Sequence, residues 1–503
     1  MDWYIRCYSG SDARNKNPGQ QQTKMKIHNY TLILAALSIG VPAAPIMAQD
    51  GDYVSREEYN QLKQQLAALQ QSLGSTQREV TSNKVTSEQI NELQTKVDHT
   101  EKITSYFSSR DMQYYRQPGK EGINVFESPK TTDIEFDGVK VRIGGASTLQ
   151  FQALTHDNDT GNLDSLSNNF NLATANLDLD VALAEGVRMH LRSYLSSRNH
   201  AEAWVKGGYI QVDSLDFIQE DFLAGMMEHL RIKVGHMETN YGDNHFRRTD
   251  NADSLYNPFV GNYIMDSFTT EVGAEVYYFH DDFFGMVGMT NGKLNQSPGE
   301  ATQDKEPSYV AKVGYDSQIN EDLRVRLTGS VYAAFDTSRQ YLYAGDRAGS
   351  RYYEVLDGGA FSGRFNPDPG NPRAGNPSEE SIAFMLNPFV KYKGLEVYGV
   401  LETVSGNDSS GNDYDAQQYA AEVLYRFGED ESFYVGVRYN LVEAELASGE
   451  DVDIDRINLG GGWFITDNIL AKIEYVTQKY DGFSGRLDGA EFDGILLEGA
   501  ISF

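Results

Sequence analysis

The stretch "FDGILLEGAISF", residues 492–503, alternates between apolar side chains and small or polar ones. Ile495, Leu497 and Phe503 share one parity, and Glu498 and Ser502 share the other. Because successive side chains of a strand point to opposite faces, this pattern predicts a β-strand with one apolar face. A soluble β-sandwich and a membrane barrel both use such strands, so the rest of the chain has to decide between them.

The composition narrows the class of protein. The 503 residues include 31 Tyr, 24 Phe and 47 Gly, and the formal net charge is −30. So acidic a chain offers no net positive surface to neutralise phosphates, which argues against nucleic acid as a partner. No stretch of about 20 apolar residues is present, which argues against a helical membrane protein. The single cysteine, Cys7, excludes a disulfide within one chain and a Cys-based metal site.

The N-terminal region reads as an export signal. Residues 25–48 combine Lys26, an apolar run over residues 31–41 and a small residue, Ala48, for cleavage, which predicts a secretory signal peptide. We therefore expect Met25 to be the true start, residues 1–24 to be an upstream overcall, and the mature chain to begin near residue 49.

A helical pattern follows over residues 49–104. Tyr59, Leu62, Leu66, Leu69 and Leu73 are spaced alternately by three and four, which is the seam of a coiled coil. A single helix cannot bury this stripe alone, so we expect it to pair with copies of itself; a helix folded back on the main domain is the alternative. Residues 105–138 show no clear period and are expected to form a linker.

From residue 139 to residue 503 the pattern has a period of two. About sixteen stretches fit strands: 139–154, 171–184, 187–196, 204–213, 229–239, 268–280, 282–291, 307–316, 322–335, 382–393, 395–405, 416–427, 432–445, 453–464, 468–479 and 492–503. Short connections such as 184–186, 280–282, 393–394, 428–432 and 466–468 alternate with long acidic ones such as 155–168, 240–267, 336–381 and 480–491.

This alternation of connection lengths decides the fold. A transmembrane antiparallel β-barrel has short turns on one side and long loops on the other, and it must close because lipid offers no partner to a strand edge. In a soluble β-sandwich, nothing requires short and long connections to alternate along the chain. The sequence thus predicts an all-β transmembrane barrel of about sixteen strands, with an apolar outer surface that faces lipid and a lumen that holds water. Eighteen strands are the alternative, because residues 339–356 contain "RQYLYAG" and "RYYEV" and could form a further hairpin.

The chain, with its terminal "GAISF", its heptads and its signal peptide, resembles a Gram-negative outer-membrane porin. It is similar in plan to the phosphate-selective porin O and P group and to trimeric dicarboxylate-type porins that carry a coiled coil. The resemblance implies a homotrimer of water-filled channels in outer-membrane lipid and lipopolysaccharide. It also implies that the coiled coil lies in the periplasm, where peptidoglycan or another periplasmic partner would be within its reach.

Parity assigns the charged residues of the strands to the lumen. A charge on the lipid-facing row costs about 2–4 kcal/mol near the membrane midplane, so charged positions are expected to point inward. The residues expected to line the pore are Arg188, His190 and Arg192 on the third strand, Arg231 and Lys233 on the fifth, Arg324 and Arg326 on the ninth, and Arg438 on the thirteenth.

The fifth connection is a candidate constriction. In sixteen-stranded porins the loop after the fifth strand folds into the lumen, and residues 240–266 occupy that place here. This segment carries Asp243, His245, Arg247, Arg248 and Asp250 together with several aromatic residues. An outer cap or a loop that latches a trimer is the alternative.

These observations predict a passive outer-membrane diffusion channel for small hydrophilic solutes or ions, with a mild anion preference. We expect no enzymatic activity, cofactor or metal, because no nucleophile elbow or triad pattern stands out. A non-channel structural or adhesive barrel, tethered by its coiled coil, is the alternative.

Overall fold

The computed structural model describes residues 60–61, 63–72, 96, 112–116, 126–195, 203–247, 253–291, 307–335, 342–343, 352–356, 363–368, 380–408 and 410–503. It divides into two compact units, residues 1–94 and 95–503, which are treated separately. In the first unit, residues 60–61 and 63–72 are helical, and Leu66 and Leu69 are exposed. Most of the predicted coiled coil, the predicted signal peptide and residues 1–24 lie outside the described residues, so these assignments stay predictions.

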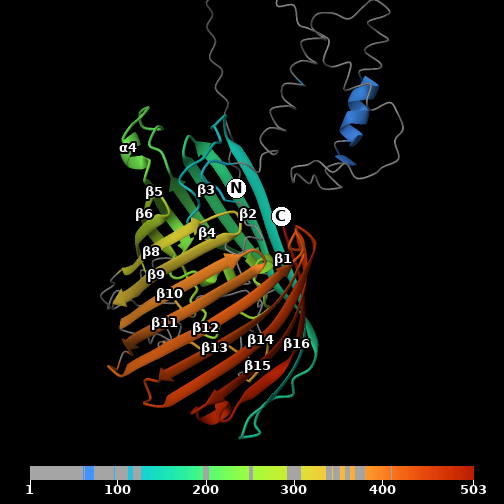
Figure 1. Ribbon diagram of the computed structural model, residues 1–503, viewed down its shortest axis with the longest axis vertical. Helices are drawn as coiled ribbons and strands as arrows, with labels where there is room; N and C mark the ends of the chain where they lie inside the picture. The colour runs from blue at the N-terminus through green and yellow to red at the C-terminus, as the bar shows by residue number, and fades with distance from the viewer. Residues whose placement is uncertain are drawn as a thin grey trace, which may run out of the picture. The chain divides into compact units, whose positions relative to one another are not determined.

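The second unit is a closed antiparallel barrel of sixteen strands (Figure 1). The strands are β1 (Lys140–Asp157), β2 (Asn169–Ala184), β3 (Val187–Leu195), β4 (Ala203–Val212), β5 (Leu230–Glu238), β6 (Thr270–His280), β7 (Phe283–Thr290), β8 (Ser308–Gln318), β9 (Leu323–Phe335), β10 (Glu380–Tyr392), β11 (Leu395–Asn407), β12 (Asp413–Phe427), β13 (Phe433–Glu445), β14 (Asp451–Thr466), β15 (Ile469–Asp481) and β16 (Glu491–Ser502). Each predicted strand is confirmed, with its bounds within three residues of those expected.

The barrel closes where β1 pairs with β16. The register runs from Ala146 opposite Ser502 to Asp157 opposite Glu491, and Phe503 extends it by exchanging backbone hydrogen bonds with Gly145. The eighteen-strand alternative is wrong. β9 pairs directly with β10, and sixteen strands complete the closed order, so the described residues between β9 and β10 add no strand to the wall.

The connections sort by length as predicted. Those between β2 and β3, β6 and β7, β10 and β11, β12 and β13, and β14 and β15 are short and lie at one end, called here the short-turn end. The connection between β4 and β5 is the exception at this end, because it runs from residue 213 to residue 229 and contains the short helix α4 (Ala224–Met227). The 3-10 helices η1 (Asn244–Arg247), η2 (Asp253–Leu255) and η4 (Gly485–Leu487) lie in connections at the opposite end. Among the described residues, no helix is both long and apolar enough to cross a membrane.

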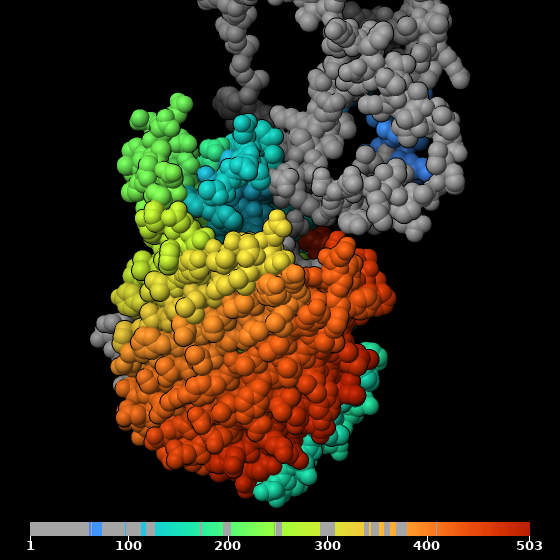
Figure 2. Space-filling model, viewed as in Figure 1, coloured from blue at the N-terminus to red at the C-terminus, as the bar shows by residue number. Residues whose placement is uncertain are grey.

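Side chains alternate across the wall. Outward residues such as Val234, Val313 and Val437 are 53%, 66% and 41% exposed, whereas inward residues such as Arg326 and Glu422 are 1% exposed. On the face viewed in Figure 2, the strands from β9 to β16 form a continuous outer surface. The parity assignment of the sequence therefore holds along the wall.

Candidate functional site in the lumen

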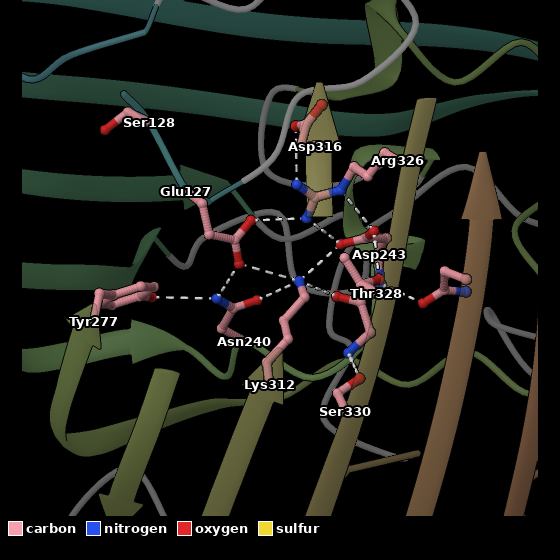
Figure 3. Close-up of polar contacts among 12 residues, drawn as sticks. Glu127, Ser128, Asn240, Asp243, Tyr277, Lys312, Asp316, Arg326, Thr328 and Ser330 are labelled. Carbon is pink, nitrogen blue, oxygen red and sulfur yellow. Dashed lines mark hydrogen bonds and ion pairs between the residues drawn. The ribbon is translucent and has the colours of Figure 1, made fainter. Parts of the chain in front are cut away.

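The long connection between β5 and β6 folds into the barrel. Asp243, which follows β5, accepts hydrogen bonds from Lys312 of β8 at 2.7 Å, Arg326 of β9 at 2.9 Å and Thr328 of β9 at 2.7 Å (Figure 3). Its carboxyl is buried, which alone would raise its pKa, but Arg326 and Lys312 hold that pKa well below its usual range. Asp243 is therefore a charged anchor of the connection on the wall.

The same connection reaches the opposite wall through its backbone. The amide of Val260 donates to Glu474 of β15 at 2.7 Å, and that of Ile264 donates to Asn440 of β13 at 2.8 Å. The amide of Met265 donates to Gln418 of β12 at 2.8 Å. The described residues 239–247 and 253–269 thus cross the lumen and are held by several strands.

Two buried arginines secure the crossing. Arg247 of the connection pairs with Glu396 of β11 at 2.8 Å and with Glu422 of β12 at 3.2 Å. Arg438 of β13 pairs with the same Glu422 at 2.7 Å and donates to the carbonyl of Gly261 at 2.8 Å. The rings of Phe259 and Tyr263 lie 4.4 Å and 4.3 Å from the Arg438 guanidinium. Arg438 therefore faces inward as predicted, but it holds the loop and is fully buried.

Apolar packing fills the part of the lumen around this crossing. Ile264 and Met265 belong to one buried cluster with Val355 and Leu356, which follow β9. The wall supplies inward apolar residues to the same cluster: Leu154, Val310, Ala334, Ala383, Met385, Val400, Val404, Ala416, Ala420, Val442, Ala444, Val452, Ile454, Val476 and Leu496. The expected wet lumen is therefore only partly correct, because this region is a hydrophobic core.

A second segment enters the barrel from the chain before β1. Glu127 pairs with Lys312 at 3.2 Å and with Arg326 at 2.9 Å, and Lys130 pairs with Asp213 at 2.9 Å. Burial would raise the pKa of Glu127, but Lys312 and Arg326 lower it to about 2. The range 105–138 was expected to be a linker, yet these described residues of it contact the barrel interior.

The remaining space includes a cavity of about 180 Å³ beside β1 to β5, which Arg188, His190, Arg192 and Lys233 help to line. Six arginine and lysine residues border this cavity against three carboxylates: Arg116, Arg142, Arg188, Arg192, Lys206 and Lys233 against Asp178, Asp180 and Glu238. The lining thus carries an excess of positive charge.

Hydrogen bonds fix the cations of this cavity. Asp180 lies 2.9 Å from both Arg188 and His190, and Arg142 lies 3.0 Å from it. Arg192 makes two bonds to Asp178, at 2.7 and 3.1 Å, and its side chain stays 18% exposed. Arg192 therefore keeps part of its charged side chain open to the cavity.

The other predicted positions are distributed elsewhere. Arg231 is fully buried and bonds Asp213 and Ser128. Arg324 bonds Asp316 and lines a cavity of about 720 Å³ at the short-turn end. His245 stacks on Phe126 at 3.9 Å between ring centroids. Arg248 and Asp250 lie outside the described residues.

Several residues of the site were missed from the sequence. Lys312 was detectable, because parity places it inward on β8 between Val310 and Gly314. Glu127 and Asn240 carry no such signal, since they lie outside the strands and meet the wall only through the fold. Among the described residues, no group of three or more His, Cys, Asp or Glu side chains is arranged to hold a metal ion.

Comparison with known proteins gives a likeness in solved structures only. No family model and no curated protein matches the chain. An anion-selective porin from Comamonas acidovorans aligns over 73% of this chain and 100% of its own length, at 13% identity and a TM-score of 0.47. The outer membrane channel DcaP of Acinetobacter baumannii covers 73% and 98%, at 13% identity and a TM-score of 0.47. OmpT, an outer membrane protein of Vibrio cholerae, covers 74% and 99%, at 11% identity and a TM-score of 0.45.

Proposed function

We propose that the chain is a passive outer-membrane channel for small hydrophilic solutes or ions, with a mild preference for anions. The observation that carries this proposal is the net positive cavity inside a closed barrel whose outer row is apolar. Rings of charged side chains set ion preference in a pore by stabilising the counter-ion. In this assignment the short-turn end faces the periplasm, and the channel carries out no covalent chemistry.

The assembly proposed with it is a homotrimer, with outer-membrane lipid and lipopolysaccharide around the barrel. The predicted coiled coil would lie in the periplasm and support such an assembly, because its apolar stripe needs a partner. Exposed Leu66 and Leu69 in the described part of the helix agree with that need.

One observation favours the alternative of a non-channel structural or adhesive barrel. The buried cluster around Ile264 and Val355 removes part of the lumen from water. A barrel filled in this way gains stability from apolar burial, at roughly 25 cal/mol per Å², without any need for conduction. Stepwise current in a planar bilayer separates the two functions, since a structural barrel gives none.

Ion selectivity tests the proposed path. We expect Arg188→Gln combined with Arg192→Gln to move the reversal potential in a salt gradient toward cation preference, because the lining loses two positive charges. Asp178 then loses Arg192, whereas Asp180 loses Arg188 but keeps Arg142 and His190. Lys479→Gln is the matched control, since Lys479 is 62% exposed at the outer end of β15. A reversal potential that moves equally in both variants, or in neither, contradicts the assigned ion path.

A further inference from the structure

The chain before β1 occupies the barrel through charge pairs with the wall. Glu127 is 5% exposed and lies between Lys312 and Arg326, while Asn240 donates to its carboxylate at 2.7 Å (Figure 3). The carboxylate thus has three polar partners, two of them cations. Such charge-assisted hydrogen bonds hold a segment in one position.

A second anchor is formed by Ser128 and Lys130. Arg231 of β5 donates to the carbonyl and to the hydroxyl of Ser128, both at 2.9 Å. Lys130 donates to Asp213 at 2.9 Å, and Asp213 also accepts from Arg231 at 2.8 Å. Residues 126–130 are therefore attached to two separate parts of the wall.

Residues 112–116 add a third anchor near the turn between β2 and β3. Gln113 donates to Glu185 at 2.7 Å and accepts from the amide of Gly186 at 3.0 Å. The ring of Tyr115 lies 5.3 Å from the Arg142 guanidinium and 5.4 Å from that of Arg188. These two arginines also border the cavity of about 180 Å³.

The position of these residues divides the space inside the barrel. The cavity of about 180 Å³ borders β1 to β5, and the cavity of about 720 Å³ is lined by Asp281 and Asp282 of a short turn. Arg116 and Ser128 line both cavities. Withdrawal of residues 112–116 and 126–130 would therefore connect the cavity of about 180 Å³ with the cavity of about 720 Å³ at the short-turn end.

The wall retains partners for its charges when this stretch leaves. Lys312 and Arg326 both keep Asp243, at 2.7 and 2.9 Å, and Arg231 keeps Asp213. Glu127 and Ser128 contact the wall through hydrogen bonds and ion pairs, which water can replace at a small net loss per hydrogen bond. Phe126 would in addition lose its stacking on His245, and Lys130 lies 4.8 Å from the Tyr114 ring within the same stretch. The crossing at Ile264, by contrast, is embedded in an apolar core.

We propose that residues 112–116 and 126–130, the tethered plug, close the short-turn end of the lumen and open it when they withdraw. The proposal rests on the channel function proposed above. It makes these described residues, which precede β1, an internal ligand of the barrel. Movement of that stretch would then set whether solutes pass.

The test places a reporter on the plug. The chain with Cys7→Ser and Ser128→Cys carries one thiol, at a position that is 7% exposed, and a water-soluble thiol reagent measures its accessibility in the folded barrel. We expect Glu127→Gln with Lys130→Gln to speed labelling at least tenfold, the factor that corresponds to 1.4 kcal/mol of lost plug binding. Glu135→Gln is the matched control, because Glu135 lies in the same stretch but is exposed; it should leave the rate unchanged.

Conductance completes the test on the same samples. The plug variant should raise the fraction of time in which the channel is open, relative to the parent and to Glu135→Gln, with folding verified by heat-dependent gel migration. Unchanged labelling in the folded variant that combines Glu127→Gln with Lys130→Gln, or faster labelling with unchanged open time, refutes the plug. Faster labelling without conduction in any variant, the parent included, instead refutes the channel function, and with it the gating role.

Discussion

At the scale of residues, the inward charges divide into two classes with different roles. Arg438 and Arg247 are fully buried against Glu422, and removing one partner of a buried ion pair typically costs about 3–5 kcal/mol. Arg192 keeps 18% of its side chain exposed beside Asp178. Neutral substitution of Arg438 should therefore lower the stability of the folded barrel. Neutral substitution of Arg192 should instead change the electrostatic potential in the cavity, which ion selectivity measures.

Acidification should weaken the folded barrel through His245. Burial, with Lys312 beside it, lowers the pKa of His245 to about 3, whereas an unperturbed histidine titrates near 6.5. Between these values the unfolded chain binds a proton that the folded chain does not, so stability falls as pH drops below about 6.5, by up to about 1.4 kcal/mol per pH unit. We expect this contribution of His245 to lower the temperature of heat-dependent gel migration at pH 5 relative to pH 7.5.

His245→Gln should reduce that difference between pH 7.5 and pH 5. The charged groups that face the ring are Lys312, Asp243, Glu127 and Arg326. Glu127, with its pKa of about 2, contributes stability above its unfolded pKa near 4.3 and loses it only below, so its contribution stays nearly constant between pH 7.5 and pH 5. His280→Gln, at a site 61% exposed, is the control. An equal pH effect in the His245→Gln and His280→Gln variants contradicts the assignment.

At the scale of elements, the connection after β5 determines how much of the lumen is free. Its described residues bond β8, β9, β11, β12, β13 and β15, which explains why 239–247 and 253–269 follow one path across the barrel. An outer cap, the alternative considered from the sequence, would make no such contacts with the inner wall. That this connection narrows the ion path remains a prediction, and a conductance measurement tests it.

Omission of residues 244–253 should raise single-channel conductance. This change removes Arg247 and its contacts with Glu396 and Glu422, while Asp243 keeps its bonds to Lys312 and Arg326. The freed volume lies inside the barrel, so ions should pass more easily. Conductance is compared only for protein whose gel migration shows a folded barrel, and a folded variant with unchanged conductance contradicts the constriction.

The strands were predictable from the sequence because their pattern is local. Alternation along residues 432–445, for instance, depends on neighbours in the chain and matches β13 closely. The filling of the lumen depends on residues far apart, such as Glu127 and Arg326, which are 199 positions apart. One signal was present, since Val400 and Val404 are apolar at inward positions of β11. Apolar residues on both faces of a strand indicate that something apolar packs inside.

At the scale of the whole molecule, the barrel depends on one seam between its first and last strands. Every other strand pair joins neighbours in sequence, but β1 and β16 close a separation of more than 300 residues. Such long-range pairing carries a large loop-closure entropy and forms slowly. Contacts at the seam therefore decide whether the sheet is a barrel or an open edge.

Gly145 provides a specific test of this seam. A Cβ atom at Gly145 would lie 2.9 Å from the Phe503 ring, so Gly145→Val must displace this ring at the short-turn end of the seam. We expect a loss of about 1–3 kcal/mol, the usual range for overpacking, seen as a lower temperature of heat-dependent gel migration. Gly499→Val on β16 is the matched control, because nothing lies within 4 Å of its Cβ position. Equal stability of the two variants would show that Phe503 does not hold the seam.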